Sequence, residues 1–424
     1  MLFGSSGIRQ EYSQSLLRLA LSTGAAVSAS ADKVIMGRDT RTTGQLLADS
    51  FMAGALSAGA DVYYGGIAPT PTVAFATRGA DLGCMITASH NPERYNGMKL
   101  INPDGSSFTK AQQKVCEEEI SQMNWKNWEN QGEVHSSDLI TPHCDAILDK
   151  IEIKEGISMV IDCGNGAGGM ITPGMLSSAG VKVHCLNCNP SGIFARPSEP
   201  LETNLPYVGR MVRKTGARGA VIHDGDADRF MAFDQKGRYI SGDHLLMLFS
   251  SWLGAEKVVT TVDASMAIEE IAEVHRTPVG DSYVSEKLID WGDFGGEPSG
   301  SWIFPGHSLC PDGIYTAALF CQIAAEWDVA EEIDKMPDYP ILRSSYHCPN
   351  PAEVVSALGA DCPTDGIRIE DENGWCLVRA SGTEPKVRIT AEGRTKAAAT
   401  AMQEKGQAML RKGRPYTNGD IKVI

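Results

Sequence analysis

Ser89 lies in the segment TASHNP, directly after a short apolar strand predicted over residues 81–86. In open α/β sheets, ligands bind beyond the carboxyl ends of the strands, which is where Ser89 falls. A hydrolase nucleophile is not indicated, because the G-x-S-x-G elbow is missing from this segment. Ser89 and His90 do not form a dyad by adjacency alone, since neighbouring side chains point in different directions. The plainer alternative is a Ser-Asn-Pro turn without a chemical role.

Three aspartates, Asp224, Asp226 and Asp228, alternate in the segment AVIHDGDADRF at the end of another predicted strand. Three carboxylates this close repel one another unless a hard cation lies among them, and oxygen ligands suit Mg²⁺. An EF-hand is excluded by spacing, because Arg229 stands where its central glycine would be and Gln235 where its final glutamate would be. A solvated acidic turn is the alternative, and the metal site is the favoured interpretation.

Two further loops carry side chains that suit a sugar and a phosphate. In GGEPSG, Glu297 and Ser299 lie two residues apart in a tight loop, so both can project toward one ligand, although the motif alone is typical of any surface turn. In RASGTEPKVR, forked cationic donors, hydroxyls and backbone N–H groups combine into a phosphate cradle, with a plain hairpin loop as the alternative. The candidate residues of this cradle are Arg379, Ser381, Gly382, Thr383 and Arg388.

Two other motifs do not point to ligands. The segment GNGAGG at residues 164–169 satisfies the dinucleotide fingerprint G-x-G-x-x-G, but no acidic residue ends the second strand, where the ribose would be held. These glycines are better explained by a tight turn from strand to helix. The pair Cys185 and Cys188 has no second pair of cysteines nearby, so a zinc site is not predicted.

The composition indicates a soluble globular protein of several domains. A chain of 424 residues exceeds the ~250–300 residues at which a single core stops growing. The formal charge is −15 and the basic residues are dispersed, so no nucleic acid is expected as a partner. No apolar run reaches the ~18 residues that span a bilayer, and the N-terminus lacks a secretory pattern. Eleven scattered cysteines are typical of thiols in a reducing compartment, so we expect a cytoplasmic protein.

The elements that must position these residues follow a repeated pattern of strand, turn, helix and strand. The repeats begin near residues 33, 158 and 257, and in the third we expect a helix capped by Ser265 and a second strand from Thr277. Strands that alternate with helices imply a parallel or mixed sheet. The last part differs, with a short helix after Asn350, a hairpin at Asn373-Gly374 and a long Ala-rich helix from about Thr395. We therefore predict an α/β protein of three related mixed α/β domains plus a smaller C-terminal α+β domain.

The boundaries of these four domains are predicted within the usual error of ~2–4 residues. The first domain, residues 1–150, contains Ser89, and the second, residues 151–245, contains the three aspartates. The third, residues 246–339, contains the GGEPSG loop. The fourth, residues 340–424, contains the phosphate cradle.

Taken in order, these loops resemble those of the α-D-phosphohexomutase superfamily along nearly the whole chain. TASHNP is similar to the phosphoserine loop of that family, DGDADR to its metal loop, GEPSG to its sugar-recognition loop and RASGTEPKVR to its phosphate-binding loop. FGSSGIR near the N-terminus and GRDTR at residues 37–41 also match family signatures. The resemblance implies a heart-shaped arrangement of the four domains.

The resemblance also implies a role for each candidate residue. Ser89 would carry a phosphoryl group, with a sugar 1,6-bisphosphate as activator. The ligands of Mg²⁺ would be a phosphoserine oxygen, Asp224, Asp226 and Asp228. The residues near the reacting phosphate would be Arg9, His90, Lys99 and Arg229, with Lys99 or His90 transferring a proton. The sugar hydroxyls would bind Glu297 and Ser299. The phosphate that does not react would bind Arg379, Ser381, Gly382, Thr383 and Arg388.

The partner that the resemblance implies is a phosphorylated hexose or hexosamine. Many family members have His after the glycine of the sugar loop, whereas this chain has Ser301 and Trp302, so a histidine proton carrier is not expected there. The GEPSG–WIFP form is most similar to archaeal-type phosphoglucosamine mutases, which favours interconversion of glucosamine 6-phosphate and glucosamine 1-phosphate. The alternatives are a phosphoglucomutase or phosphomannomutase and, further off, a metal-dependent sugar phosphatase or a sugar-phosphate-binding protein. A homodimer is left open, and no membrane partner is expected.

Overall fold

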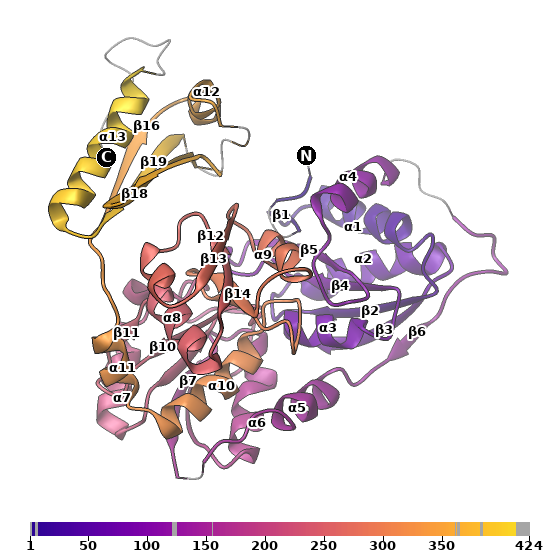
Figure 1. The fold of residues 1–424 in the computed structure, drawn as a ribbon. Helices are drawn as coiled ribbons and strands as arrows, with labels where there is room; N and C mark the ends of the chain where they lie inside the picture. Colours follow the sequence, from indigo (N-terminus) through magenta and orange to yellow (C-terminus); the bar gives the residue numbers. More distant parts are fainter. Residues whose placement is uncertain are drawn as a thin grey trace.

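The described residues form four β-sheets in four successive stretches of the chain, coloured from indigo to yellow in Figure 1. This computed structural model describes residues 2–4, 7–120, 125–154, 156–360, 362, 365–381 and 385–412. Three of the sheets mix parallel and antiparallel pairs and the last is antiparallel, which confirms the predicted fold class. Within these residues, every helix is too short or too polar to cross a membrane.

The first sheet has the strand order β1-β5-β4-β2-β3-β6, and its central strand β4 is apolar and completely buried. The parallel register of β2 and β4 pairs Arg38 with Ile86, so the residues that follow these two strands emerge side by side at one edge. The elements are β1 (Ile8–Glu11), α1 (Gln14–Val27), β2 (Lys33–Arg38), α2 (Gly44–Ser57), β3 (Asp61–Ile67), α3 (Thr70–Thr77), β4 (Leu82–Ile86), β5 (Tyr95–Ile101), α4 (Lys110–Glu119), β6 (Val134–Ser136) and α5 (Ile140–Leu148).

The second sheet has the order β11-β10-β9-β7-β8, and parallel register again brings two loops to one edge. Its parallel strands β7 and β9 pair Asp162 with Ile222, so the loops after these strands also lie side by side. The elements are β7 (Ser158–Asp162), η1 (Ala167–Met170), α6 (Thr172–Ser178), β8 (Lys182–Leu186), η2 (Glu202–Asn204), α7 (Pro206–Thr215), β9 (Ala220–His223), β10 (Phe230–Phe233) and β11 (Tyr239–Ile240).

The third sheet, of order β13-β12-β14-β15, shares one hydrophobic core with the second. Phe249 of α8 links the two, because its ring centroid lies 6.0 Å from that of Phe230 on β10 and 5.5 Å from that of Trp302 on β15. The elements are α8 (Gly242–Leu253), β12 (Lys257–Thr261), η3 (Met266–Glu270), β13 (Glu273–Thr277), α9 (Asp281–Leu288), β14 (Phe294–Glu297), β15 (Ser301–Ile303), α10 (Gly313–Glu326) and α11 (Val329–Lys335).

The third repeat differs from its prediction in two places. Ser265 does cap a helix, but only the single-turn 3₁₀ helix η3. The strand expected from Thr277 is wrong, because β13 ends at Thr277 and the following residues form helix α9. The apolar and polar residues of SYVSEKL suit either structure, and the buried set Val284, Ser285 and Leu288 has helical spacing.

The fourth sheet, of order β16-β19-β18-β17, carries α12 and α13 on one face (Figure 1). Each sheet together with its helices is called a unit, numbered in chain order. The other face of the fourth sheet meets the third unit through the buried carboxylate of Glu392, which accepts hydrogen bonds from Ser265 Oγ (2.5 Å) and the Met266 N–H (2.7 Å). The predicted hairpin is confirmed, since Asp371 pairs with Gly374. The elements are β16 (Ile341–His347), α12 (Pro351–Ala357), β17 (Ile367–Asp371), β18 (Gly374–Ala380), β19 (Lys386–Gly393) and α13 (Lys396–Lys412).

Candidate active site

Ser89 lies just beyond the carboxyl end of β4, in a segment that we call the Ser89 loop (residues 87–97). Its backbone has a φ of +49°, a left-handed conformation that is uncommon for serine and is held by the surroundings. The Ser89 N–H donates to Thr87 Oγ1 at 2.8 Å. The Ser89 hydroxyl donates to Asp224 Oδ2 at 2.9 Å, and its oxygen lies 3.4 Å from His90 Nδ1. The nucleophile candidate is therefore aimed at the aspartates predicted from the sequence.

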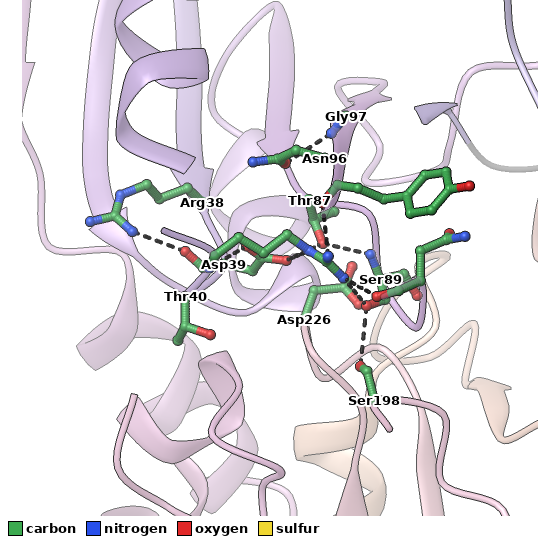
Figure 2. Close-up of polar contacts among 12 residues, drawn as sticks. Arg38, Asp39, Thr40, Thr87, Ser89, Asn96, Gly97, Ser198 and Asp226 are labelled. Atoms are coloured by element: carbon green, nitrogen blue, oxygen red, sulfur yellow. Dashed lines mark hydrogen bonds and ion pairs between the residues drawn. The ribbon is translucent and has the colours of Figure 1, made fainter. Parts of the chain in front are cut away.

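The buried guanidinium of Arg41 holds the Ser89 loop from within. Its Nε–H donates to the carboxylate of Asp39 at 3.0 Å. The same carboxylate accepts the hydroxyl of Thr87 at 2.7 Å (Figure 2). The acceptors of its other N–H groups are the carbonyl oxygens of Ser89 (2.7 Å), Asn91 (2.7 Å), Pro92 (2.7 Å) and Tyr95 (2.8 Å). Every N–H group of the Arg41 side chain thus has an acceptor, and all but one of the acceptors belong to the Ser89 loop.

The three aspartates lie together on a segment that we call the aspartate loop (residues 224–228), and their ligand atoms are within 4.8 Å of one another. Lys99 Nζ on β5 donates to Asp226 Oδ2 (2.8 Å) and Asp228 Oδ2 (2.5 Å). Among the described residues, Asp226 Oδ1 and Asp228 Oδ1 are buried and have no hydrogen-bond partner. Buried carboxylate oxygens without donors are costly, and a hard cation would satisfy them, so these residues fit a Mg²⁺ site.

Burial and mutual repulsion govern the charges of these groups. Burial, and then the neighbouring Asp228, raise the pKa of Asp224 well above its usual value. Burial opposes ionisation of Asp226 as well, but the charge of Lys99 and the hydrogen bonds from Lys99 and Thr70 together outweigh it and lower the pKa of Asp226. Burial alone would lower the pKa of Lys99, yet the two aspartates that it contacts raise it. Lys99 is therefore held as a cation between two carboxylates.

The two loops touch because Gly225 has no side chain. A Cβ at Gly225 would lie 2.8 Å from the Ser89 carbonyl oxygen, closer than real Cβ contacts allow. Ser198 Oγ donates to the same carbonyl at 3.2 Å (Figure 2). A second contact joins the first unit to the aspartate loop, because Thr70 at the start of α3 donates its hydroxyl to Asp226 Oδ2 at 2.5 Å. The first and second units are thus joined directly at the site.

A cavity of about 420 Å³ opens in front of Ser89 and collects candidate residues from all four units. Of the residues predicted from the sequence, it is lined by Arg9, Ser89, His90, Asp228, Arg229, Glu297, Ser299 and Arg379. Sequence reasoning missed Glu199, Asp243, Asp263, Asp281 and Arg343, which also line it. Lys99, Asp224 and Asp226 lie behind this lining, where they contact one another or Ser89.

The third unit brings its sugar-loop candidates to the cavity through pairing with the second. Arg229 forms a β-bridge with Ser301, and Phe230 N–H donates to the Gly300 carbonyl at 2.9 Å. Burial, and then the nearby Asp281, raise the pKa of Glu297 to about 8. Across the cavity, the charge of Arg229, burial and Arg9 lower the pKa of His90 to about 2, so its ring is neutral.

The fourth unit presents arginines on the face of its sheet that is turned away from α13. Arg379 on β18 and Arg388 on β19 are direct cross-strand partners, and Arg379 Nη2 also lies 4.0 Å from the Asp263 carboxylate, so the two cations share a face of the sheet that an anion would stabilise. Ser381 Oγ is buried and lacks a hydrogen-bond partner in the described part of the chain. Gly382 and Thr383, the other residues predicted for the phosphate cradle, lie outside the described residues.

Comparison with known proteins agrees with this architecture. Models for the phosphoglucomutase/phosphomannomutase family match in four consecutive segments: α/β/α domain I at residues 1–126, domain II at 141–237, domain III at 241–339 and the C-terminal domain at 345–406. The chain therefore belongs to the phosphoglucomutase/phosphomannomutase family of enzymes.

Similar proteins match over almost the full length of the chain. A probable phosphoglucosamine mutase of Methanocella arvoryzae is 41% identical, covering 97% of this chain and 98% of its own. A phosphoglucosamine mutase of Methanococcus aeolicus is 39% identical, with coverage of 97% and 98%. Among solved structures, a phosphoglucomutase/phosphomannomutase family protein of Burkholderia thailandensis superposes with a TM-score of 0.86 at 24% identity, covering 98% of both chains, which bears on the fold alone.

Replacement of Arg41 by lysine tests whether the guanidinium positions Ser89. Arg41→Lys keeps the charge but cannot reach the same set of acceptors, so the Ser89 loop should shift. Since a displacement of ~1 Å in an active site can cost ~10²-fold in rate, we expect kcat to fall by about that factor with little change in KM. Steady-state kinetics on the sugar phosphate and a melting curve measure both effects. The control is Arg38→Lys, whose guanidinium bonds to Tyr64, Gln45 and the Asp39 carbonyl instead. A folded Arg41→Lys enzyme with the wild-type kcat would contradict the role.

Proposed function

We propose that this chain interconverts glucosamine 6-phosphate and glucosamine 1-phosphate through phosphorylated Ser89 and a sugar bisphosphate. The observation that carries the proposal is the Ser89 hydroxyl, 2.9 Å from Asp224, in a cavity that Glu297 and Arg379 also line. Transfer of a phosphoryl group between two oxygens of one sugar needs positioning and charge neutralisation around a nucleophile. The names of the similar proteins, phosphoglucosamine mutases, support this choice of sugar.

The acidic lining of the cavity supports an amino sugar as the substrate. Besides Glu297, the carboxylates of Asp243, Asp263 and Asp281 line the same cavity. A cation of the substrate close to these carboxyl groups would favour their ionised form and be attracted by it, and the ammonium group at C2 of glucosamine is such a cation. Phosphates of glucose or mannose lack this charge and are the second candidates.

The covalent step exchanges one P–O bond for another. The bond from phosphorus to Ser89 Oγ breaks and a bond to a hydroxyl oxygen of the bound monophosphate forms, which yields the bisphosphate. The hydroxyl proton passes by way of His90, whose neutral ring lies beside Ser89 Oγ, to the Ser89 oxygen that is released, so that Ser89 ends as a hydroxyl. The negative charge of the bound phosphates would raise the pKa of His90 again, because it offsets Arg9 and Arg229. After the bisphosphate has turned over, its other phosphate returns to Ser89.

Cations supplied by the chain surround the reacting phosphate. Arg9 and Arg229 line the cavity beside Ser89, and Lys99 offsets the charge of the aspartates behind it. Asp224, Asp226 and Asp228 would hold Mg²⁺, which when bound supplies positive charge to a phosphoserine oxygen.

The fourth unit would bind the phosphate that is not reacting. Arg379 and Arg388 face the same side of the sheet, and the buried Ser381 hydroxyl adds a donor in need of a partner. Arg343 of β16 lines the cavity and would join them. Glu297 and Ser299 would form hydrogen bonds to the sugar hydroxyls, which lie between the two phosphate positions. Because the sugar binds in two orientations, a fixed phosphate clamp serves both of them.

A panel of sugar phosphates tests the proposed reaction and substrate. The 1- and 6-phosphates of glucosamine, glucose and mannose, each with trace bisphosphate, should give isomerisation with the highest kcat/KM for glucosamine. Phosphate release without isomerisation would indicate a phosphatase, and binding without turnover a sugar-phosphate-binding protein. Equal or higher kcat/KM for glucose or mannose phosphate would contradict the choice of sugar while leaving the mutase reaction intact.

Removal of one aspartate tests the metal site. Asp226→Asn takes away a charge and an oxygen aimed at the cation, so Mg²⁺ affinity measured by calorimetry should fall at least ~10-fold. Turnover should cease with a chelator and return with Mg²⁺. The matched control is Asp263→Asn, which removes a cavity carboxylate outside the aspartate loop and should leave Mg²⁺ affinity unchanged. Wild-type Mg²⁺ affinity in Asp226→Asn would refute the assignment.

Removal of one arginine tests the clamp. A clamp that holds substrate and transition state alike affects mainly KM. Loss of a charge-assisted contact costs roughly 1.5–3 kcal/mol, so Arg388→Ala should raise KM by about one to two decades with a smaller change in kcat. Arg368→Ala is the control, because Arg368 stacks on Trp375 of the same sheet and is not a candidate for the phosphate cradle, while Arg368 and Arg388 alike are absent from the residues that line the cavity. An unchanged KM in Arg388→Ala, with only its melting temperature lowered, would show that Arg388 is structural.

A further inference from the structure

Two cysteines that the reaction does not use lie in contact behind the aspartate loop. Cys163 directly follows β7 and Cys188 follows β8, and these parallel strands pair Asp162 with Leu186, so both cysteines emerge at the same edge of the sheet. Their Sγ atoms are 3.5 Å apart. Two thiols at this separation need only a small movement to reach the ~2.05 Å length of a disulfide.

The two cysteines of the pair differ in exposure. Cys163 is completely buried, whereas Cys188 is half-buried and Cys185, on β8, is exposed. The contact also shifts the pKa values of the two thiols in opposite directions. The pKa of Cys188 is lowered, first by its hydrogen bond with Cys163, and the pKa of Cys163 is raised by the same bond and by burial. Cys188 is therefore the thiol that an external reagent meets first.

The segment after Cys163 supports the aspartate loop. A Cβ at Gly166 would lie 2.8 Å from the Asp224 carbonyl oxygen, and the Ala167 N–H donates to the Gly225 carbonyl at 2.9 Å. Residues 163–167 are thus packed directly against the residues that face Ser89. Because of this packing, a displacement of Cys163 would also displace Asp224.

We propose that Cys163 and Cys188 form a reversible disulfide, and that its formation slows turnover by displacing Asp224 from Ser89. The cysteine chemistry stands by itself, whereas its effect on turnover rests on the proposed function of Ser89 and the aspartate loop. Closing the gap from 3.5 Å to ~2.05 Å moves the sulfur atoms by about 1.5 Å in sum. A displacement of ~1 Å at a reacting group is enough to cost ~10²-fold in rate.

The oxidant is a low-molecular-weight disulfide. The Cys188 thiol loses its proton and attacks one of its sulfur atoms, which releases one external thiol and leaves a mixed disulfide on Cys188. The Cys163 thiol then loses its proton, attacks Cys188 Sγ and releases the second external thiol. The protein thiols lose two electrons and two protons in total, and the external disulfide gains them.

The bond is tested on the intact protein by mass spectrometry. After incubation with oxidised glutathione, the intact mass should fall by about 2 Da, because two hydrogen atoms are lost, and dithiothreitol should restore it. Trypsin cleaves after Lys182, so Cys163 falls in one peptide while Cys185 and Cys188 fall in the next. The proposal expects these two peptides to be cross-linked. A bond between Cys185 and Cys188 within one peptide, a stable glutathione adduct on Cys188, or no reaction at all would overturn it.

The effect on turnover is tested with matched cysteine variants. Oxidised wild-type enzyme should lose at least ~10-fold in kcat and recover it with dithiothreitol. Cys188→Ser should keep its full rate in the same oxidant, whereas Cys144→Ser, on α5, should be as sensitive as the wild type. Full activity of enzyme in which the cross-link has been verified would overturn the link to Asp224. Because the peptide map needs no activity, it stands even if the proposed reaction is wrong.

Discussion

The structure is organised around three buried carboxylates that must stay together beside a nucleophile. Placing like charges a few ångströms apart in a water-poor site is unfavourable unless cations offset them. Lys99 provides one fixed ammonium group, and the oxygens of Asp226 and Asp228 that lack a partner among the described residues leave a place for a divalent cation. The cationic residues of the cavity extend this compensation to the phosphates of a substrate. The same arrangement that makes the aspartate loop costly without cations makes it suitable for phosphoryl transfer.

Precision at this site comes from strand register and from one buried arginine. The parallel pair β2–β4 places Asp39 beside Thr87. In the same way, the parallel pair β7–β9 places Cys163 beside the start of the aspartate loop. Arg41 then fixes the carbonyl groups of the Ser89 loop, so that the left-handed conformation of Ser89 is maintained. The Ser89 loop and the aspartate loop belong to different units, and they meet without a gap because Gly225 allows the backbone of one to lie against the other.

Much of this arrangement could be predicted from the sequence, because the Ser89 and aspartate motifs each follow an apolar strand and consist of polar residues. Ser89 and the aspartates were found in this way, whereas Glu297 was found from its spacing in a tight loop and from the family resemblance, and the structure brings them together. Arg41 appeared in the sequence only as part of the GRDTR signature, since nothing local shows that its acceptors lie some fifty residues further along the chain. The cavity residues Arg343 and Asp243 carry no motif, and their placement depends on how the third and fourth units pack. The third repeat was misread where helix and strand periodicities both fit a short amphipathic segment.

The central claim is that Ser89 carries the phosphoryl group between the two positions of the sugar. Enzyme incubated with glucosamine 1,6-bisphosphate labelled with ³²P, then digested and mapped, tests it directly. The account predicts one labelled peptide with about 80 Da added at Ser89, and loss of that label within a turnover when unlabelled glucosamine 6-phosphate is added. Label on another residue, label that the monophosphate cannot remove, or full turnover by Ser89→Ala would contradict it.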